Sequence, residues 1–153
     1  RAYSRRCGEG RSAVQPHALM SSSDQPFWDA VDVLRERDGR YHREAYGFVV
    51  GALGVAVRAL PAERRSDPMR RHLSGRELLT AITRIAREEF GALAATVFRE
   101  WGITAGEDIG RIVFELVEAS QLSARPEDSI EDFCGGPDLL AALSTSNPAS
   151  ASR

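Results

Sequence analysis

The sequence predicts an all-α fold, a compact bundle of about five helices. Apolar residues recur three and four positions apart through most of the chain, and no convincing segment alternates apolar and polar residues as a strand would. Glycine and proline fall mostly at the ends of the apolar segments. With 153 residues, 42% of them hydrophobic, the chain has the size of one globular domain and can bury a core without disulfides or metals.

The first two helices are predicted from the positions of proline and glycine. The first begins at Gln25 or Pro26 and runs to about Arg37, because proline is tolerated in a first turn and "RDGR" ends the segment. The second covers about residues 41–60, and a charged loop, "PAERRSDPMRRH", follows it. Its apolar stripe consists of Ala45, Phe48, Val49, Ala52, Leu53, Ala56 and Leu60.

Three further helices follow, two of which begin with a predicted capping box. Ser74 with Glu77 opens the third helix and Thr104 with Glu107 opens the fifth. Gly91 separates the third helix from a fourth, "ALAATVFREW". The residues predicted to face the core are Leu78, Leu79, Ile82, Ile85, Ala86 and Phe90 in the third helix, Leu93, Ala94, Val97, Phe98 and Trp101 in the fourth, and Ile109, Ile112, Val113, Leu116 and Val117 in the fifth.

The C-terminal half has the rhythm of a helix-turn-helix, so a winged-helix-like arrangement of that half is an alternative within the all-α class. At 100° per residue, the fifth helix is expected to turn Glu107, Arg111, Glu115 and Glu118 toward solvent. The loop that would form the wing, "RPEDSIED", is rich in acids. Such a surface repels DNA, so we do not expect this helix to read a groove.

Both ends of the chain are predicted to lie outside the folded domain. Residues 1–19 show no apolar period and are expected to be a disordered leader upstream of a natural start at Met20, with a transit peptide as the alternative. A single helical domain is expected over residues 24–143. The polar, low-complexity residues 144–153 are expected to form a disordered tail.

The charged residues do not predict a concentrated basic face. All 20 basic residues are arginine and 22 acids outnumber them, which argues against a typical polyanion-binding protein. Residues 1–76 carry 14 arginines and 9 acids, whereas residues 77–153 carry 6 and 13. Cys7 and Cys134 fit neither a disulfide framework nor a metal cluster, which favours a reducing compartment, the cytoplasm. The uncharged residues 45–57 are too few to span a membrane, so no membrane partner is expected.

Two surfaces are candidates for binding a partner. The first is an arginine ridge on and before the third helix, suited to RNA, to an acidic protein or to the chain's own acidic C-terminal half. Its residues are Arg70, Arg71, Arg76, Arg84 and Arg87. The second is a glycine stripe on the second helix, formed by Gly47, Gly51 and Gly54.

Each interior glycine costs a helix about 1 kcal/mol, so the glycine stripe indicates that something approaches the backbone closely. Another helix of the same chain is the first explanation, a homodimer seam through the second helix the next, and a ligand groove the last. Phe114 lies off the apolar stripe of the fifth helix. It is expected to be covered by Ile130 or Phe133, or else to anchor a partner.

No catalytic, cofactor or metal-binding residue is predicted. His17, His42 and His72 have no neighbouring ligand at zinc spacing, and no phosphate-binding glycine loop or nucleophile elbow is present. Cys134 is expected to be structural, because no histidine lies close to it in the sequence. The acidic segment 127–138 lacks the calcium-loop pattern, and a solvated segment is favoured over a cation site.

Four blocks in a fixed order carry a family resemblance. They are "FWDAVDVLRERDGRYHREAYGFVVGAL", "RHLSGRELLTAI", "EEFGALAATVFREWGITAGEDIGRIVFELVEASQLS" and "EDSIEDF". Over residues 27–133 the chain resembles a bacterial family found largely in planctomycetes and verrucomicrobia, whose members have no assigned activity. The resemblance therefore implies no functional residues. This chain departs from the family at "CGGPDLL", where members carry a longer aromatic and acidic ending.

The sequence thus predicts a small, cytoplasmic, non-enzymatic helical domain that binds another macromolecule, in the first place a protein. The alternative is a winged-helix-like nucleic-acid-binding protein that uses the arginine ridge. An enzyme is the third hypothesis.

Overall fold

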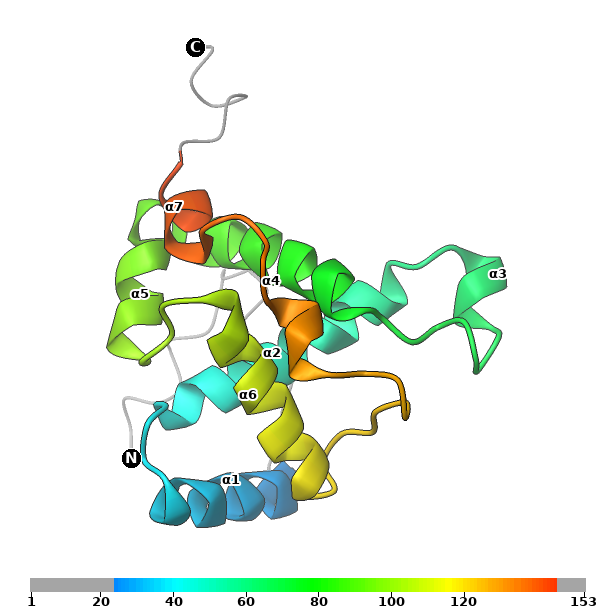
Figure 1. The fold of residues 1–153 in the computed structure, drawn as a ribbon, viewed down its shortest axis with the longest axis horizontal. Coiled ribbons are helices and arrows are strands. Elements are labelled where there is room, and N and C mark those ends of the chain that lie inside the picture. The colour runs from blue at the N-terminus through cyan, green and yellow to red at the C-terminus, as the bar shows by residue number, and fades with distance from the viewer. Residues whose placement is uncertain (1–23, 146–153) are drawn as a thin grey trace, which may run out of the picture.

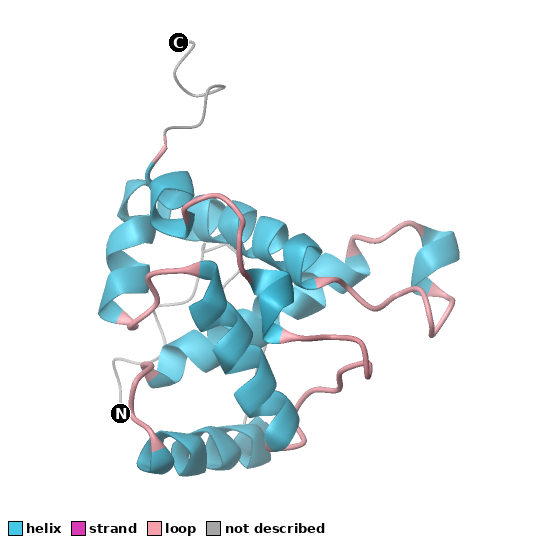
Figure 2. Ribbon diagram, viewed as in Figure 1, coloured by secondary structure: helices cyan, strands magenta, loops and turns pink. Residues whose placement is uncertain are grey.

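A computed structural model describes residues 24–145, and within this range every regular element is a helix (Figure 1, Figure 2). The all-α class predicted from the sequence is therefore confirmed. The predicted leader, residues 1–19, lies outside the described range, as does most of the predicted tail. The described residues contain no strand, so the acidic loop after the fifth predicted helix does not form a β-wing.

Helix α2 (Arg43–Arg58) lies at the centre of the bundle. It packs against α1 (Gln25–Arg37), α4 (Gly75–Phe90) and α6 (Gly106–Glu118) (Figure 1). Its buried residues are Ala45, Tyr46, Gly47, Phe48, Val49, Gly51, Ala52 and Ala56. Burial on so many sides agrees with its apolar composition, because a helix that is apolar nearly all round belongs in a core.

The ends of the first two helices follow from local chemistry. Helix α1 has the predicted bounds, with Pro26 in its first turn. Helix α2 is two residues shorter at each end than the predicted 41–60. At its start, the His42 ring accepts a hydrogen bond from the backbone N–H of Glu44 at 3.2 Å and so caps the helix.

The segment between α2 and α4 was expected to be a charged loop, and this expectation is corrected by a one-turn helix, α3 (Ala62–Arg65). Pro61 precedes the turn, where its fixed backbone angle favours helix initiation. Residues 59–73, here called the arm, project from the body of the molecule (Figure 1).

Helix α4 begins with the predicted capping box of Ser74 and Glu77. It is followed by a 3-10 turn, η5 (Gly91–Leu93), and by α5 (Ala94–Glu100). Leu93, predicted to face the core, is 63% exposed because the 3-10 turn breaks the helical period there. The inward orientation predicted for four aromatic residues is confirmed, because they form one cluster in which each ring centroid lies within 5.7 Å of another. These residues are Phe48, Phe90, Phe98 and Trp101.

The start of α6 differs from its prediction. Glu107 does not cap it; the carboxylate of Asp108 accepts hydrogen bonds from the backbone N–H groups of Thr104 at 2.9 Å and Ala105 at 3.1 Å. Asp108 was not singled out in the sequence, because it follows the more familiar capping-box glutamate.

The C-terminal segment folds back over the bundle. It contains the 3-10 turn η6 (Ile130–Phe133) and helix α7 (Leu139–Ser144). A Cβ atom added to Gly110 of α6 would lie 2.8 Å from the Phe133 ring, so only glycine allows this approach. The segment therefore closes one side of the core, and it places α7 against α4 and α5.

Candidate functional site

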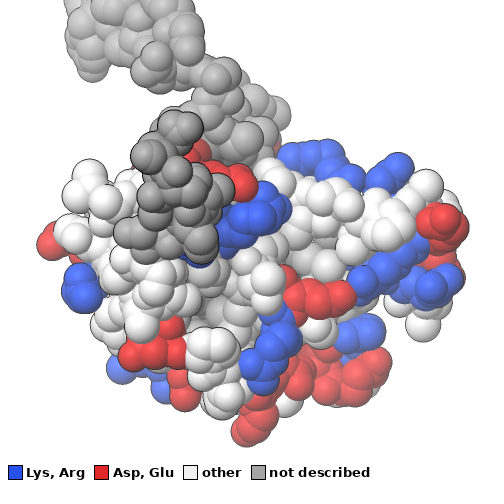
Figure 3. Space-filling view, turned by 90° about the horizontal axis from the view of Figure 1, so that it is seen from above, with Lys and Arg blue, Asp and Glu red and all other residues white. Residues whose placement is uncertain are grey.

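A groove of about 1130 Å³ runs along the solvent-facing side of α4. One wall carries the residues of the arginine ridge that lie on this helix, Arg76, Arg84 and Arg87. The opposite wall is formed by residues 135–139 and by α7, and the start of α6 contributes Thr104 to Glu107. Figure 3 views the molecule from the side of α4 and α7 and shows basic and acidic side chains interspersed on it.

The floor of the groove is apolar. Leu79 of α4 is half-buried, while Phe133, Leu139 and Leu143 line the groove but are at most 6% exposed, so Leu79 offers a ligand more apolar surface than any of these three. The groove therefore combines a cationic wall with an apolar floor, which is the composition of a surface that binds an amphipathic segment.

The charges that line the groove are not all available to a ligand. Arg84 pairs with Glu88 at 3.1 Å, and Asp138 caps α7 by accepting a hydrogen bond from the backbone N–H of Ala141 at 3.0 Å. Within residues 24–145, neither Arg76 nor Arg87 pairs with a carboxylate. These two guanidinium groups are unpaired cations of the groove, and Glu107, an acid of the same lining, forms no ion pair with a described residue either.

The chain's own C-terminal half was one expected partner of the arginine ridge. It does reach Arg76, since a Cβ atom added to Gly136 would lie 2.6 Å from the Arg76 Nη1 atom. This contact is with backbone, and none of the described acids in segment 127–138 pairs with a ridge arginine. Self-neutralisation of the ridge by that segment is therefore not what the structure shows, and within residues 77–153 the ridge arginine that pairs with a described acid is Arg84, with Glu88.

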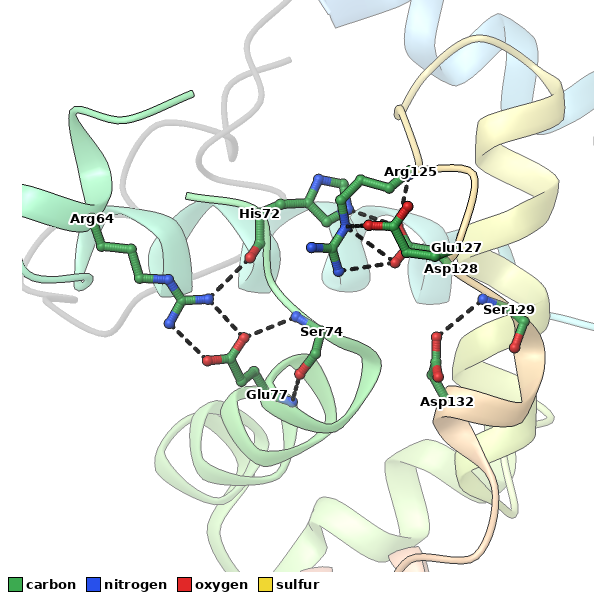
Figure 4. A network of polar contacts seen from close by, with 9 residues as sticks. All are labelled: Arg64, His72, Ser74, Glu77, Arg125, Glu127, Asp128, Ser129 and Asp132. Carbon is green, nitrogen blue, oxygen red and sulfur yellow. Dashed lines mark hydrogen bonds and ion pairs between the residues drawn. The ribbon is translucent and has the colours of Figure 1, made fainter. Parts of the chain in front are cut away.

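Arg70 and Arg71, the other two ridge residues, lie apart from the groove on the arm. The arm is braced by Arg64, a residue that the sequence analysis did not single out (Figure 4). Its guanidinium donates to the carbonyl oxygens of Arg70 at 2.6 Å and His72 at 3.0 Å. It also donates to both carboxylate oxygens of Glu77, at 2.7 and 2.8 Å.

Glu77 thus joins the arm to α4. It accepts from Arg64 and from the backbone N–H of Ser74 at 2.9 Å. These hydrogen bonds lower the pKa of Glu77 from 4.5 to about 2, and the bond from Arg64 has the largest effect. The capping glutamate predicted from sequence therefore has a second role, which only the tertiary contact with Arg64 reveals.

A second contact ties the end of the arm to the loop after α6. The Nε2 atom of His72 lies 2.9 Å from Asp128, whose carboxylate also accepts from the backbone N–H of Arg125 at 2.8 Å and from its guanidinium at 3.0 Å (Figure 4). Burial alone would raise the pKa of Asp128, but the bonds from Arg125 and His72 outweigh it and lower the pKa. His72, expected to be isolated, is in fact a tertiary anchor.

The acidic segment 127–138 is largely occupied with local hydrogen bonds. Asp132 accepts from the backbone N–H of Ser129 at 3.0 Å, and Asp128 and Asp138 each accept from a backbone N–H group three residues away. Across residues 24–145, no three His, Cys, Asp or Glu side chains are grouped so that they could hold a metal ion.

The first residue of the glycine stripe of α2 is used within the chain. A Cβ atom added to Gly47 would lie 2.6 Å from the Trp28 ring of α1, so the close helix expected as the first explanation is present at Gly47. Gly51 is buried, and Gly54 is half-exposed. The homodimer seam along this stripe stays a prediction.

Phe114 lies beside Phe133, with ring centroids 6.5 Å apart in an edge-to-face arrangement. The expectation that the C-terminal segment covers it is confirmed. The remaining exposed part of Phe114 lines a smaller cavity of about 290 Å³ beneath the arm.

The outward face predicted for α6 needs correction. Glu118 and Arg111 are exposed, but Glu107 and Glu115 are half-buried. Glu115 accepts a hydrogen bond from the Tyr46 hydroxyl at 2.6 Å, and burial together with this carboxylate raises the pKa of the Tyr46 hydroxyl. Only part of the expected acidic face is therefore turned to solvent.

A neighbouring buried pair joins the start of α2 to the same helix. The Tyr41 hydroxyl donates to Asp108 at 2.6 Å, and burial together with this bond raises the pKa of Tyr41 to about 12. Burial would raise the pKa of Asp108, but the bonds from Tyr41, Thr104 and Ala105 outweigh it and lower the pKa.

The residues considered for catalysis are not brought together. His42 is exposed and caps α2, and His72 pairs with Asp128. Partial desolvation and the Glu107 carboxylate raise the pKa of the Cys134 thiol, which makes it a weak nucleophile at neutral pH. None of the helices in the described range combines the length and apolar character needed to cross a membrane.

Comparison with known proteins assigns no family and no function to the chain. The chain matches no protein-family model, no curated protein and no solved structure.

Proposed function

We propose that the protein is a non-catalytic interaction module of the bacterial cytoplasm that holds an acidic segment of a partner protein in the groove along α4. The observation that carries the proposal is the pair of unpaired guanidinium groups, Arg76 and Arg87, on the wall of a groove with an apolar floor. Arg87 is half-buried, and a partly shielded guanidinium attracts a carboxylate more strongly than a fully solvated one does.

The size of the groove supports a macromolecular ligand. Pockets for small molecules usually enclose roughly 300–1,000 Å³. The groove slightly exceeds this range at about 1130 Å³ and is lined from Arg76 to Glu88 along α4. A stretch of polypeptide suits such an elongated site better than a compact metabolite does.

A binding assay with charge-reversed variants tests the proposal. Fluorescein-labelled peptides rich in glutamate and leucine are titrated with the full chain and followed by fluorescence anisotropy at two salt concentrations. We expect binding that weakens as salt rises and that is lost in the Arg76→Glu, Arg87→Glu double variant.

The matched control reverses Arg58 and Arg99, which are exposed and do not line the groove. This double variant has the same net charge as the test variant and should bind as the wild type does. Equal loss in both variants would show that only the net charge matters, and absence of binding by the wild type would refute the proposal.

Nucleic-acid binding is the second candidate, and the arm is the observation that favours it. Arg70 and Arg71 are exposed on the arm and pair with no described carboxylate, and the brace from Arg64 holds their backbone in place. A gel shift with duplex and single-stranded probes, lost in an Arg70→Glu, Arg71→Glu variant and retained in the groove variant, would support this candidate instead.

A further inference from the structure

We propose that the cavity beneath the arm binds a free amino acid with an apolar side chain. This site is separate from the groove along α4, since within the described residues the two linings have Phe133 alone in common. The proposal follows from the apolar interior of the cavity, from the charged residues of its lining and from the contacts that fix the arm beside it.

The interior of the cavity is apolar and is built from several parts of the chain. Its volume of about 290 Å³ is close to the lower limit for small-molecule pockets, which is roughly 300 Å³. Because half-buried apolar side chains of the lining keep part of their surface in water, an apolar ligand that covers them gains free energy. These residues are Leu53 and Val57 of α2, Leu73 of the arm, Val113 and Phe114 of α6, and Leu122 of the loop that follows.

Two exposed residues of opposite charge, Arg71 and Asp132, also line the cavity. They do not pair with each other, and within residues 24–145 neither forms an ion pair with another side chain. The Oδ2 atom of Asp132 accepts a hydrogen bond from the backbone N–H of Ser129 at 3.0 Å, which leaves its Oδ1 atom able to accept from a ligand.

The remaining acid of the lining, Asp128, is already compensated. Its carboxylate accepts from the guanidinium of Arg125 at 3.0 Å and lies 2.9 Å from Nε2 of His72 (Figure 4). The lining therefore offers a ligand one cation and one anion. Asp132 repels a plain carboxylic acid and Arg71 repels a plain amine, whereas a zwitterion is attracted by both. An amino acid carries both charges, and its side chain supplies the apolar body.

The arm is fixed on both sides of Arg71. Arg64 donates to the carbonyl oxygens of the two neighbouring residues, Arg70 at 2.6 Å and His72 at 3.0 Å. The contact of His72 with Asp128 then joins the arm to the loop after α6. Because these bonds hold the wall of the cavity in place before a ligand arrives, binding costs less conformational entropy than it would on a free loop.

Nuclear magnetic resonance titrations of the isotope-labelled full chain test the site and the class of ligand. The main probes are L-leucine and L-phenylalanine. The comparison probes are N-acetyl-L-leucine, which lacks the ammonium group, L-leucinamide, which lacks the carboxylate, and L-alanine, which lacks most of the apolar body. We expect L-leucine to shift the amide signals of Leu73, Val113 and Leu122 and to leave those of Thr83 and Ala142, which line the groove, unchanged. The comparison probes should bind about fivefold more weakly than L-leucine.

Two variants test the charged residues, each with a neighbouring control. Arg71→Gln and Asp132→Asn should each weaken the binding of L-leucine about fivefold. Both residues are exposed, and asparagine can still accept the hydrogen bond from Ser129, so the fold should be kept. The controls, Arg70→Gln and Glu131→Gln, change exposed neighbours outside the lining and should bind as the wild type does.

Three results would overturn the proposal. The first is the absence of shifts at the cavity with both L-leucine and L-phenylalanine. The second is equal affinity of the wild type for L-leucine and for either singly charged analogue, which would show that the ligand need not be a zwitterion. The third is equal binding of L-leucine by the Arg71 and Arg70 variants, or by the Asp132 and Glu131 variants. None of these results bears on the groove, which is tested with acidic peptides.

Discussion

Replacement of Asp108 by alanine is expected to destabilise the protein strongly. The buried carboxylate accepts from the Tyr41 hydroxyl at 2.6 Å and from two backbone N–H groups at the start of α6. Tyr41 is only 1% exposed, so its O–H would lose its acceptor without gaining water, at a cost of about 1–3 kcal/mol. Loss of the helix cap adds about 1 kcal/mol, and the total of about 2–4 kcal/mol is a large part of a typical domain's stability.

Urea unfolding followed by circular dichroism at 222 nm measures this loss directly. Glu107→Ala is the matched control, since Glu107 stands where the sequence predicted the capping carboxylate, and we expect it to cost under about 0.5 kcal/mol. Tyr41→Phe made in the Asp108→Ala background should restore about 1–2 kcal/mol, because it removes the orphaned hydroxyl. The reasoning would be refuted if Asp108→Ala and Glu107→Ala cost the same, or if Tyr41→Phe destabilised the alanine variant further.

Three other predictions test the arm and the glycine stripe. Folding lowers the pKa of Glu77, so the stability that its carboxylate contributes is complete above pH 4.5, the ordinary pKa, and is lost as the pH falls toward about 2. Between pH 4.5 and about 2, the free energy of unfolding should therefore depend less on pH in the Glu77→Gln variant than in the wild type. Arg64→Ala should raise amide hydrogen exchange at residues 66–73 about tenfold, whereas Arg70→Ala, which removes an exposed side chain with no described partner, should leave exchange unchanged. Gly47→Ala should destabilise the protein by about 1–3 kcal/mol, because the added methyl group meets the Trp28 ring. Gly54→Ala is the control: its methyl group meets only the end of the Arg58 side chain, so the substitution should be neutral or stabilising by up to about 1 kcal/mol. Equal effects of the two substitutions in thermal unfolding would contradict the assigned packing.

Local patterns alone determined the helical content of this protein. The bounds of α1, the capping box of α4 and the break at Gly91 depend on residues within one or two turns of each other. Most core residues could also be predicted from local patterns, because a helix that buries one stripe carries its apolar residues on that stripe. The sequence also predicted that Ile130 or Phe133 would cover Phe114, because an apolar ring off the main stripe needs a cover, and Phe133 does so.

Only the tertiary structure decided which polar groups turn inward and where the binding surface lies. Glu115 and Asp108 were indistinguishable from solvent-facing acids until Tyr46 and Tyr41, more than sixty residues earlier in the chain, were brought against them. The brace from Arg64 to Glu77 and the anchor from His72 to Asp128 likewise join residues that no periodicity relates. The groove exists because residues 135–145 fold back beside α4. Whether a carboxylate turns inward depends on a partner that compensates its desolvation, and that partner can lie far away in the sequence.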